Sequence, residues 1–134
     1  MFRLAVPLLL LVVLAGGCGT SDDRDQARAT VERFYDAVRH DDAEAACEEL
    51  GDSLLEQVES QTQQSCRGVI TRFEYEGGSI ERTQVFITNA KVDLDSGESA
   101  FLSREDDGWK LSAIACKALE GKPADRPFEC EAAS

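Results

Sequence analysis

The stretch from Thr83 to Lys117 constrains the fold most strongly, because it alternates like a series of antiparallel strands. Between Ala90 and Asp95, apolar residues take every second position and charged residues take the positions between them. A period of two is typical of a strand with one buried face and one solvated face. We therefore expect an antiparallel sheet, and the segment before it has to supply the cover for the apolar face.

Short turn-forming segments separate the predicted strands. Thr88-Asn89 follows a first strand at Val85–Ile87, and Asp95-Ser96-Gly97 contains a glycine that tolerates positive φ. The clearest hairpin signal is Asp106-Asp107-Gly108, which lies between two strand-like runs. After that turn, alternation places Trp109, Leu111, Ala113 and Ala115 on one face, and Ile114 and Cys116 on the other.

Helical periodicity precedes the strands. Ala27, Val31, Phe34 and Val38 recur at helical spacing and form one apolar stripe on a helix of about four turns, for which Ser21 is a candidate N-cap. Two shorter helices are expected, and they begin near Asp41–Asp42 and Asp52–Ser53. The polar segment 59–65 connects to 67–75, which we interpret as a short strand or an irregular connection, and the tail 117–134 is expected to be coil.

The N-terminus has the pattern of an export signal. Arg3 is followed by an apolar run, Leu4–Leu14, which is short for a bilayer span and typical of a secretory signal. The run ends in Leu14-Ala15-Gly16-Gly17-Cys18, which resembles the lipobox of bacterial lipoproteins. That resemblance implies cleavage before Cys18 and diacylation of this residue. The alternative is an ordinary cleaved signal peptide with Cys18 free.

The charge balance excludes some partners. Removal of 1–17 takes away one basic residue, Arg3, so 13 basic residues remain against 26 acidic ones, a net charge of −13. Phosphates would repel such a chain, which argues against nucleic acid. Anionic lipid would repel it too, so membrane attachment would depend on the acyl chains of Cys18.

The cysteine count predicts two disulfides. Export implies an oxidising compartment, and apart from Cys18 four cysteines remain, which allow three pairings. We favour Cys47–Cys66 and Cys116–Cys130, because each pair joins neighbouring segments and closes a loop of about 15–20 residues, worth about 3 kcal/mol. No metal site is predicted, because the chain has no C-x-x-C pair and its one histidine is not at ligand spacing from a cysteine. No cofactor is predicted either.

The segments Val31–Cys47 and Asp106–Cys116 together resemble small lipid-anchored bacterial proteins with a nuclear transport factor 2-like domain, also called cystatin-like or SnoaL-like. The resemblance covers about residues 25–117. It implies a curved antiparallel sheet that wraps around a long first helix and makes a cone with an internal pocket. Four apolar residues are then expected to line that pocket: Phe34, Val38, Trp109 and Leu111.

The same resemblance bears on catalysis. Ketosteroid isomerase-like members use an inward carboxylate as base and a tyrosine of the first helix as oxyanion donor. At the matching helix position this chain has Phe34, and Tyr35 lies one residue later, about 100° around the helix and off the apolar stripe. Loss of an oxyanion donor costs about 10²–10³ in rate, so catalysis is disfavoured.

The sequence therefore predicts an α+β protein whose N-terminal helices pack on a curved antiparallel sheet. Residues 1–17 are the lipoprotein signal peptide, 18–25 a lipidated tether, and 26–134 a single domain with a disulfide-pinned tail. We expect a membrane-anchored, extracytoplasmic, non-catalytic protein that binds a small apolar ligand or an envelope protein. The alternatives are an isomerase- or cyclase-like enzyme and a structural envelope protein.

Overall fold

The computed structural model describes residues 20–119 and 128–134. Its helical part comprises α1 (Thr20–Arg39), α2 (Ala43–Glu48), α3 (Asp52–Thr62), α4 (Cys66–Val69) and the 3₁₀ helix η1 (Ile70–Arg72). Its strands are β1 (Ile80–Phe86), β2 (Asn89–Leu94), β3 (Glu98–Glu105), β4 (Gly108–Ala118) and β5 (Phe128–Ala133). The predicted α+β class, with the helices before the strands, is confirmed.

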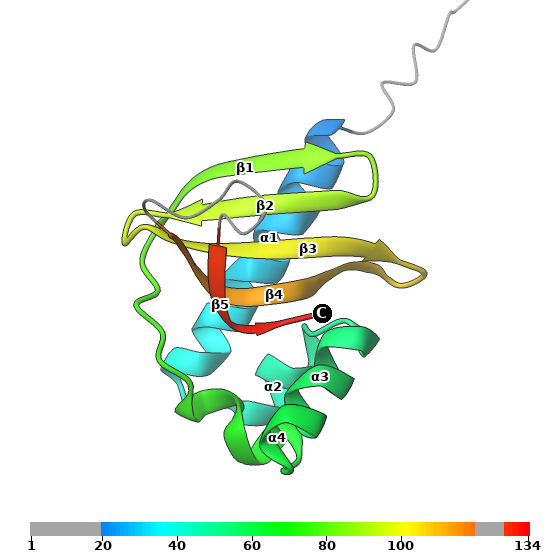
Figure 1. Cartoon of the computed structure of the whole chain (residues 1–134). Coiled ribbons are helices and arrows are strands. Elements are labelled where there is room, and N and C mark those ends of the chain that lie inside the picture. The colour runs from blue at the N-terminus through cyan, green and yellow to red at the C-terminus, as the bar shows by residue number, and fades with distance from the viewer. Residues whose placement is uncertain (1–19, 120–127) are drawn as a thin grey trace, which may run out of the picture.

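The five strands form one antiparallel sheet in the order β1-β2-β3-β4-β5. The sheet is curved and unclosed, and β1 and β5 are its edges. Figure 1 shows α1 crossing behind the sheet, while α2, α3 and α4 gather at the end of the sheet near β4 and β5. The sheet therefore has one face covered by α1.

The core lies between α1 and this covered face. In β2 the predicted alternation is confirmed, because Ala90, Val92 and Leu94 are buried and the residues between them are not. The apolar stripe of α1 meets them through Val31 and Phe34, which are fully buried. The buried side chains of β2 and α1 thus belong to a single core. Leu54 and Val58 of α3 and Leu102 of β3 complete it.

In β4 the predicted alternation is wrong after Leu111. The pairing with β3 shifts register twice, first between the partners of Phe101 and Leu102 and then between those of Ser99 and Phe101. Ala115 has φ +52°, the conformation of an extra residue in a β-bulge. Each extra residue reverses the face of those that follow, so Ile114 joins Trp109 and Leu111 in the core.

The first hairpin also differs from its prediction. β1 ends at Phe86, so Ile87 and Thr88 form the turn and Asn89 is already in β2. Ile87 has φ +36°, a conformation that β-branched residues rarely adopt. Its β-propensity favoured a strand position, but the pairing of Phe86 with Asn89 requires a two-residue turn.

The predicted tether is helical from Thr20 onward, because α1 begins there and Ser21 lies inside the helix. Asp22 and Asp23 are in the first turn, where the helix dipole favours negative charge. The carboxylate of Asp23 also accepts hydrogen bonds from the Arg104 guanidinium and, at 3.3 Å, from the indole of Trp109. These contacts join the first turn of α1 to β3 and β4. The remainder of the predicted tether and the signal peptide lie outside the described residues.

Residues 59–75 continue the helical layer. α3 extends to Thr62, and its C-cap, Gln63, takes the left-handed conformation with φ +57°. Two short helices, α4 and η1, then occupy 66–72, where a strand or an irregular connection was predicted. Val69 and Ile70 are buried there, which shows that this segment supplies core side chains.

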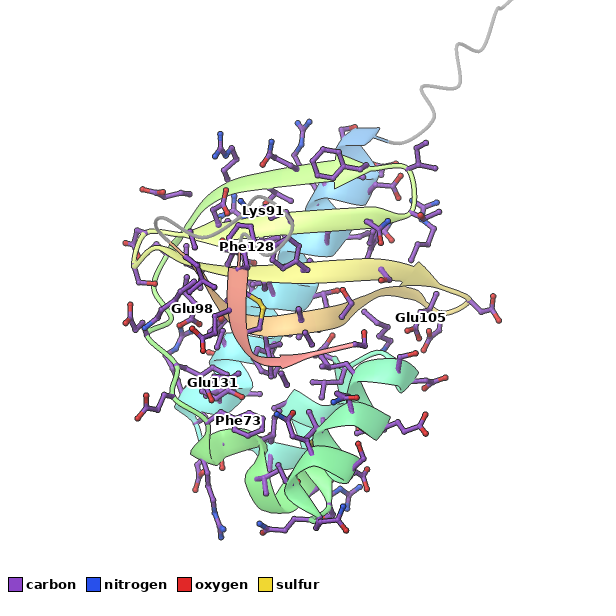
Figure 2. All side chains as sticks on the ribbon, viewed as in Figure 1. Phe73, Lys91, Glu98, Glu105, Phe128 and Glu131 are labelled. Carbon is purple, nitrogen blue, oxygen red and sulfur yellow. A yellow bond between two sulfur atoms is a disulfide. The ribbon has the colours of Figure 1, made fainter. Side chains whose placement is uncertain are left out.

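The C-terminal tail is a strand where coil was predicted. β5 pairs antiparallel with β4, and Cys116 lies directly opposite Cys130 in that pairing. Figure 2 shows Phe128 beside Lys91 in front of the sheet, and the ammonium nitrogen lies 4.8 Å from the ring centroid. The structure joins Cys116 to Cys130 and Cys47 to Cys66, which are the two favoured pairs.

Candidate functional site

A groove of about 540 Å³ runs between α1 and the segment that leads into β1. One wall is a face of α1 that carries Arg28, Glu32 and Arg39, residues at positions i, i+4 and i+11 of the helix. The opposite wall is Gly78–Ile80. Val31, Tyr35 and Leu94 also line the groove, and all three are almost completely buried. The groove therefore has a narrow apolar floor between charged rims.

Hydrogen bonds to the β2–β3 turn hold the wall at Gly78–Ile80 in place. Ser79 exchanges two bonds with Asp95, because its N–H donates to Oδ1 at 3.0 Å and its carbonyl accepts from the Asp95 N–H at 2.9 Å. The hydroxyl of Ser96 donates to the Gly77 carbonyl at 2.5 Å. Gly78 has φ +113°, and a Cβ there would lie 2.1 Å from Asp95 Oδ1. Glycine is therefore required at this position in the wall.

Beneath the floor lies a buried polar pair. The Tyr35 hydroxyl donates to Oε1 of Glu98, a residue with no exposed surface, and the Glu76 N–H donates to Oε2 at 2.8 Å. In the described residues, no buried side-chain nitrogen or oxygen is left without a hydrogen-bond partner. The pair connects α1 to β3 and to the segment before β1, so it holds the floor residue Tyr35 in place. Figure 2 shows Glu98 at the end of the sheet where that segment passes.

Burial controls the protonation of the tyrosines. Burial and then the hydrogen bond to Glu98 raise the pKa of Tyr35 far above its ordinary value of 10.0. The pKa of Tyr75 is also raised, mainly by burial and then by the charges of Glu131 and Glu98. The Tyr75 hydroxyl donates to the Ile70 carbonyl at 2.6 Å. Both phenols thus stay protonated at neutral pH and act as hydrogen-bond donors.

Sequence reasoning missed this pair. Tyr35 was predicted to turn off the apolar stripe, but it is 4% exposed, because the segment before β1 covers the side of α1 that the sheet leaves open. Glu98 gave no signal, because one acidic residue among many others in this chain looks like a solvated one. Its position two residues before Ala100, on the apolar face of the strand, is the feature that could have identified it.

Charge distinguishes this groove from the others in the described part of the chain. Three arginines and two carboxylates line it, and on α1 Arg28 pairs with Glu32 at 2.8 Å and Arg39 with Asp36 at 3.2 Å. A groove near the β3–β4 turn is instead lined by five carboxylates and one lysine: Glu48, Asp52, Glu105, Asp106, Asp107 and Lys110. In a protein with 26 acidic and 14 basic residues, an arginine-rich groove is the unusual one.

The residues predicted to line an internal pocket lie elsewhere. Phe34, Trp109 and Leu111 are buried in the core, and Val38 packs against that core. The groove beside α1 is lined by other residues. Cys18, the predicted lipidation site, lies outside the described residues.

Among residues 20–119 and 128–134, no group of three or more potential ligands is placed to hold a metal ion. None of the helices within that same part of the chain has the length and apolarity needed to cross a bilayer. Comparison with protein-family models, with curated proteins and with solved structures found no match to this chain.

Proposed function

We propose that this chain is a lipid-anchored extracytoplasmic protein with a nuclear transport factor 2-like, cystatin-like domain that binds a partner protein without catalysing a reaction. The lipobox-like segment that ends at Cys18 supports the anchor. The two cysteine pairs, Cys47–Cys66 and Cys116–Cys130, support an oxidising compartment. A long first helix against a curved antiparallel sheet is compatible with the family fold.

The observation that carries the binding proposal is the arginine-rich groove between α1 and Gly78–Ile80. Two of its three arginines, Arg28 and Arg39, make exposed ion pairs with neighbours on the same helix, and such pairs are worth about 0–1 kcal/mol. The third, Arg33, pairs at 2.7 Å with Glu49, beyond α2. An acidic segment of a partner can therefore replace Glu32 and Asp36 as the counter-charge at little cost. Because the core between α1 and the sheet is filled by its own side chains, the groove suits a surface segment of a protein better than a small apolar ligand.

A photo-crosslinking residue placed at Ser79, an exposed position on the groove wall, tests this proposal in the native envelope. We expect one defined crosslinked product, and its loss when Arg28→Glu and Arg39→Glu are combined. The matched control is Arg67→Glu, which reverses the charge of an equally exposed arginine that pairs with Glu44 on another surface. An unchanged product in the double variant, or no product at all, would contradict the proposed binding site.

Detergent phase partitioning tests the anchor. The mature protein is expected in the detergent phase, and Cys18→Ala is expected to move it to the aqueous phase, because two or three acyl chains anchor firmly. Mass spectrometry of the intact protein would also show the acyl mass on Cys18. Equal partitioning of the two proteins would refute the anchor.

One observation supports the isomerase-like alternative, because Glu98 is an inward carboxylate that contacts a tyrosine of α1. Against this alternative, Glu98 has no exposed surface and both of its oxygens already accept hydrogen bonds. The core between α1 and the sheet is filled by the protein's own side chains, which is as compatible with a structural envelope protein as with a binding protein. Loss of a specific crosslink in the groove variants would favour binding over both alternatives.

A further inference from the structure

The turn between β1 and β2 carries an apolar tip, Phe86 and Ile87. In the described part of the chain these are the large apolar residues that remain exposed, at 56% for Phe86 and 92% for Ile87. Ile87 also has φ +36°, a turn conformation for which glycine or asparagine is the usual residue. Neither burial nor the backbone conformation therefore accounts for an isoleucine at this position.

Hydrogen bonds place the apolar tip beside the start of α1. The carbonyl of Thr88, in the same turn, accepts from the Arg104 N–H at 2.8 Å, and the Arg104 guanidinium pairs with Asp23 in the first turn of α1. Figure 1 shows the β1–β2 turn at the same end of the molecule as the beginning of α1. Only one residue separates Cys18 from Thr20, where the helix begins. Two residues of extended chain span at most about 7 Å, so an acylated Cys18 would stay near this end of the domain.

We infer that the apolar tip inserts into the surface of the same bilayer that holds the acyl chains of Cys18, an inference that rests on the proposed lipid anchor. An aromatic and an aliphatic side chain suit the boundary between headgroups and acyl chains. Two side chains are too few for a stable protein interface, which buries at least about 1,000 Å². Since the mature chain carries a net charge of −13, the attraction to the bilayer has to be apolar and not electrostatic.

The inserted tip gives the domain a second attachment point to the membrane. With Cys18 alone, the domain could rotate freely about a single covalent point. Contact at both Cys18 and Ile87 fixes which side of the domain faces the lipid. The groove lined by Arg28 and Arg39 would then keep a constant orientation relative to the membrane.

Quenching by brominated lipid tests the inference on the lipidated protein. Ile87→Trp is reconstituted in phosphatidylcholine vesicles with ordinary or brominated acyl chains, and flotation is measured on the same samples. The control is Glu56→Trp, an exposed position on α3, which lies at the far end of the molecule from the start of α1 (Figure 1). Wild-type protein is measured in parallel, because the fluorescence of Trp109, which is 4% exposed, is subtracted from that of each variant.

We expect brominated lipid to reduce the added fluorescence of Ile87→Trp by about twofold or more, as for a side chain within the acyl boundary, and to leave Glu56→Trp unchanged. If Ile87→Trp does not fold, Phe86→Trp serves as the second reporter. Flotation without quenching of either reporter would overturn the membrane contact and leave the anchor intact. If the reporters are not quenched and sedimentation detects a dimer, the membrane contact is also overturned, and the apolar tip is instead a contact between two copies of the chain. Failure of the wild-type protein to float would refute the anchor and, with it, this inference.

Discussion

Removal of the Tyr35 hydroxyl is the sharpest test of the buried polar pair. In Tyr35→Phe, Oε1 of Glu98 loses its donor in a site with no exposed surface, and only the bond from the Glu76 N–H remains on Oε2. A hydrogen bond to a charged group contributes about 1.5–3 kcal/mol, and a buried acceptor left unpaired adds its desolvation cost. We therefore expect Tyr35→Phe to lower the free energy of unfolding by about 2–3 kcal/mol, a large part of a typical total of about 5–15 kcal/mol.

Urea unfolding at pH 7 with the disulfides intact measures this loss. The matched control is Tyr75→Phe, which removes a hydroxyl that donates to the neutral carbonyl of Ile70 and should cost about 1 kcal/mol. Glu98→Gln completes a double-mutant cycle with Tyr35→Phe, for which we expect a coupling energy of at least about 1 kcal/mol. A loss for Tyr35→Phe no larger than that for Tyr75→Phe, or a coupling energy near zero, would refute the reasoning.

Three further predictions concern stability. Because burial raises the pKa of Tyr35 and of Tyr75, the unfolded chain binds fewer protons than the folded one above pH 10, so the free energy of unfolding should fall there by about 1.4 kcal/mol per pH unit for each tyrosine. Urea midpoints between pH 9 and pH 11 check this, and a slope in Tyr35→Phe that is not smaller than in the wild type would contradict it. Ile87→Asn should raise the melting temperature of the domain in solution by about 4–8 °C, because relief of an unfavourable positive φ is worth about 1 kcal/mol. Thermal unfolding followed by circular dichroism measures this, and a melting temperature below that of the wild type would contradict the prediction. Replacement of both Cys116 and Cys130 by serine should cost about 3 kcal/mol, since their loop spans a sequence separation of 14; a change in urea stability below about 1 kcal/mol would show that the pairing of β5 with β4 alone holds the tail.

The parts of the fold that could be predicted are those in which one residue pattern has one physical meaning. The alternation from Ala90 to Leu94 identified β2 and its buried face, and the stripe from Ala27 to Phe34 identified the buried face of α1. Both patterns are local, because a helix or a strand repeats its geometry at a constant interval.

The parts that could not be predicted depend on contacts between distant segments. The register shift between Leu111 and Ala113 moves Ile114 to the core, but such a shift is created by the pairing of two strands and leaves alternation in the sequence unchanged. The burial of Tyr35 depends on the segment before β1, which lies more than forty residues further along the chain. β5 was not predicted because it is short and its residue pattern is weak. The favoured pairing of Cys116 with Cys130 did predict that the tail returns to the domain, and the structure joins these two residues.

In the candidate site, too, the local residue pattern could be predicted from the sequence and the contact between distant segments could not. The helical spacing of Arg28, Glu32 and Arg39 is visible in the sequence, but it indicates only a solvated helix face. The groove arises because Gly78–Ile80 is held opposite that face by the β2–β3 turn, where the Asp95 carboxylate and the Ser96 hydroxyl bond to the backbone of a segment distant in sequence. The pocket predicted from the family resemblance and the groove described for this chain are therefore lined by different residues.

The sequential strand order has a consequence for how the protein acquires its structure. Each strand pairs with its neighbour along the chain, so every hairpin can form early from residues that are close in sequence, and only short loops have to close. The slow entropic step is then the docking of the first helix onto the finished meander, because the Thr30 hydroxyl reaches the Trp109 carbonyl across 79 residues. Until Trp109 has been synthesised, the apolar stripe of that helix has no complete sheet to pack against.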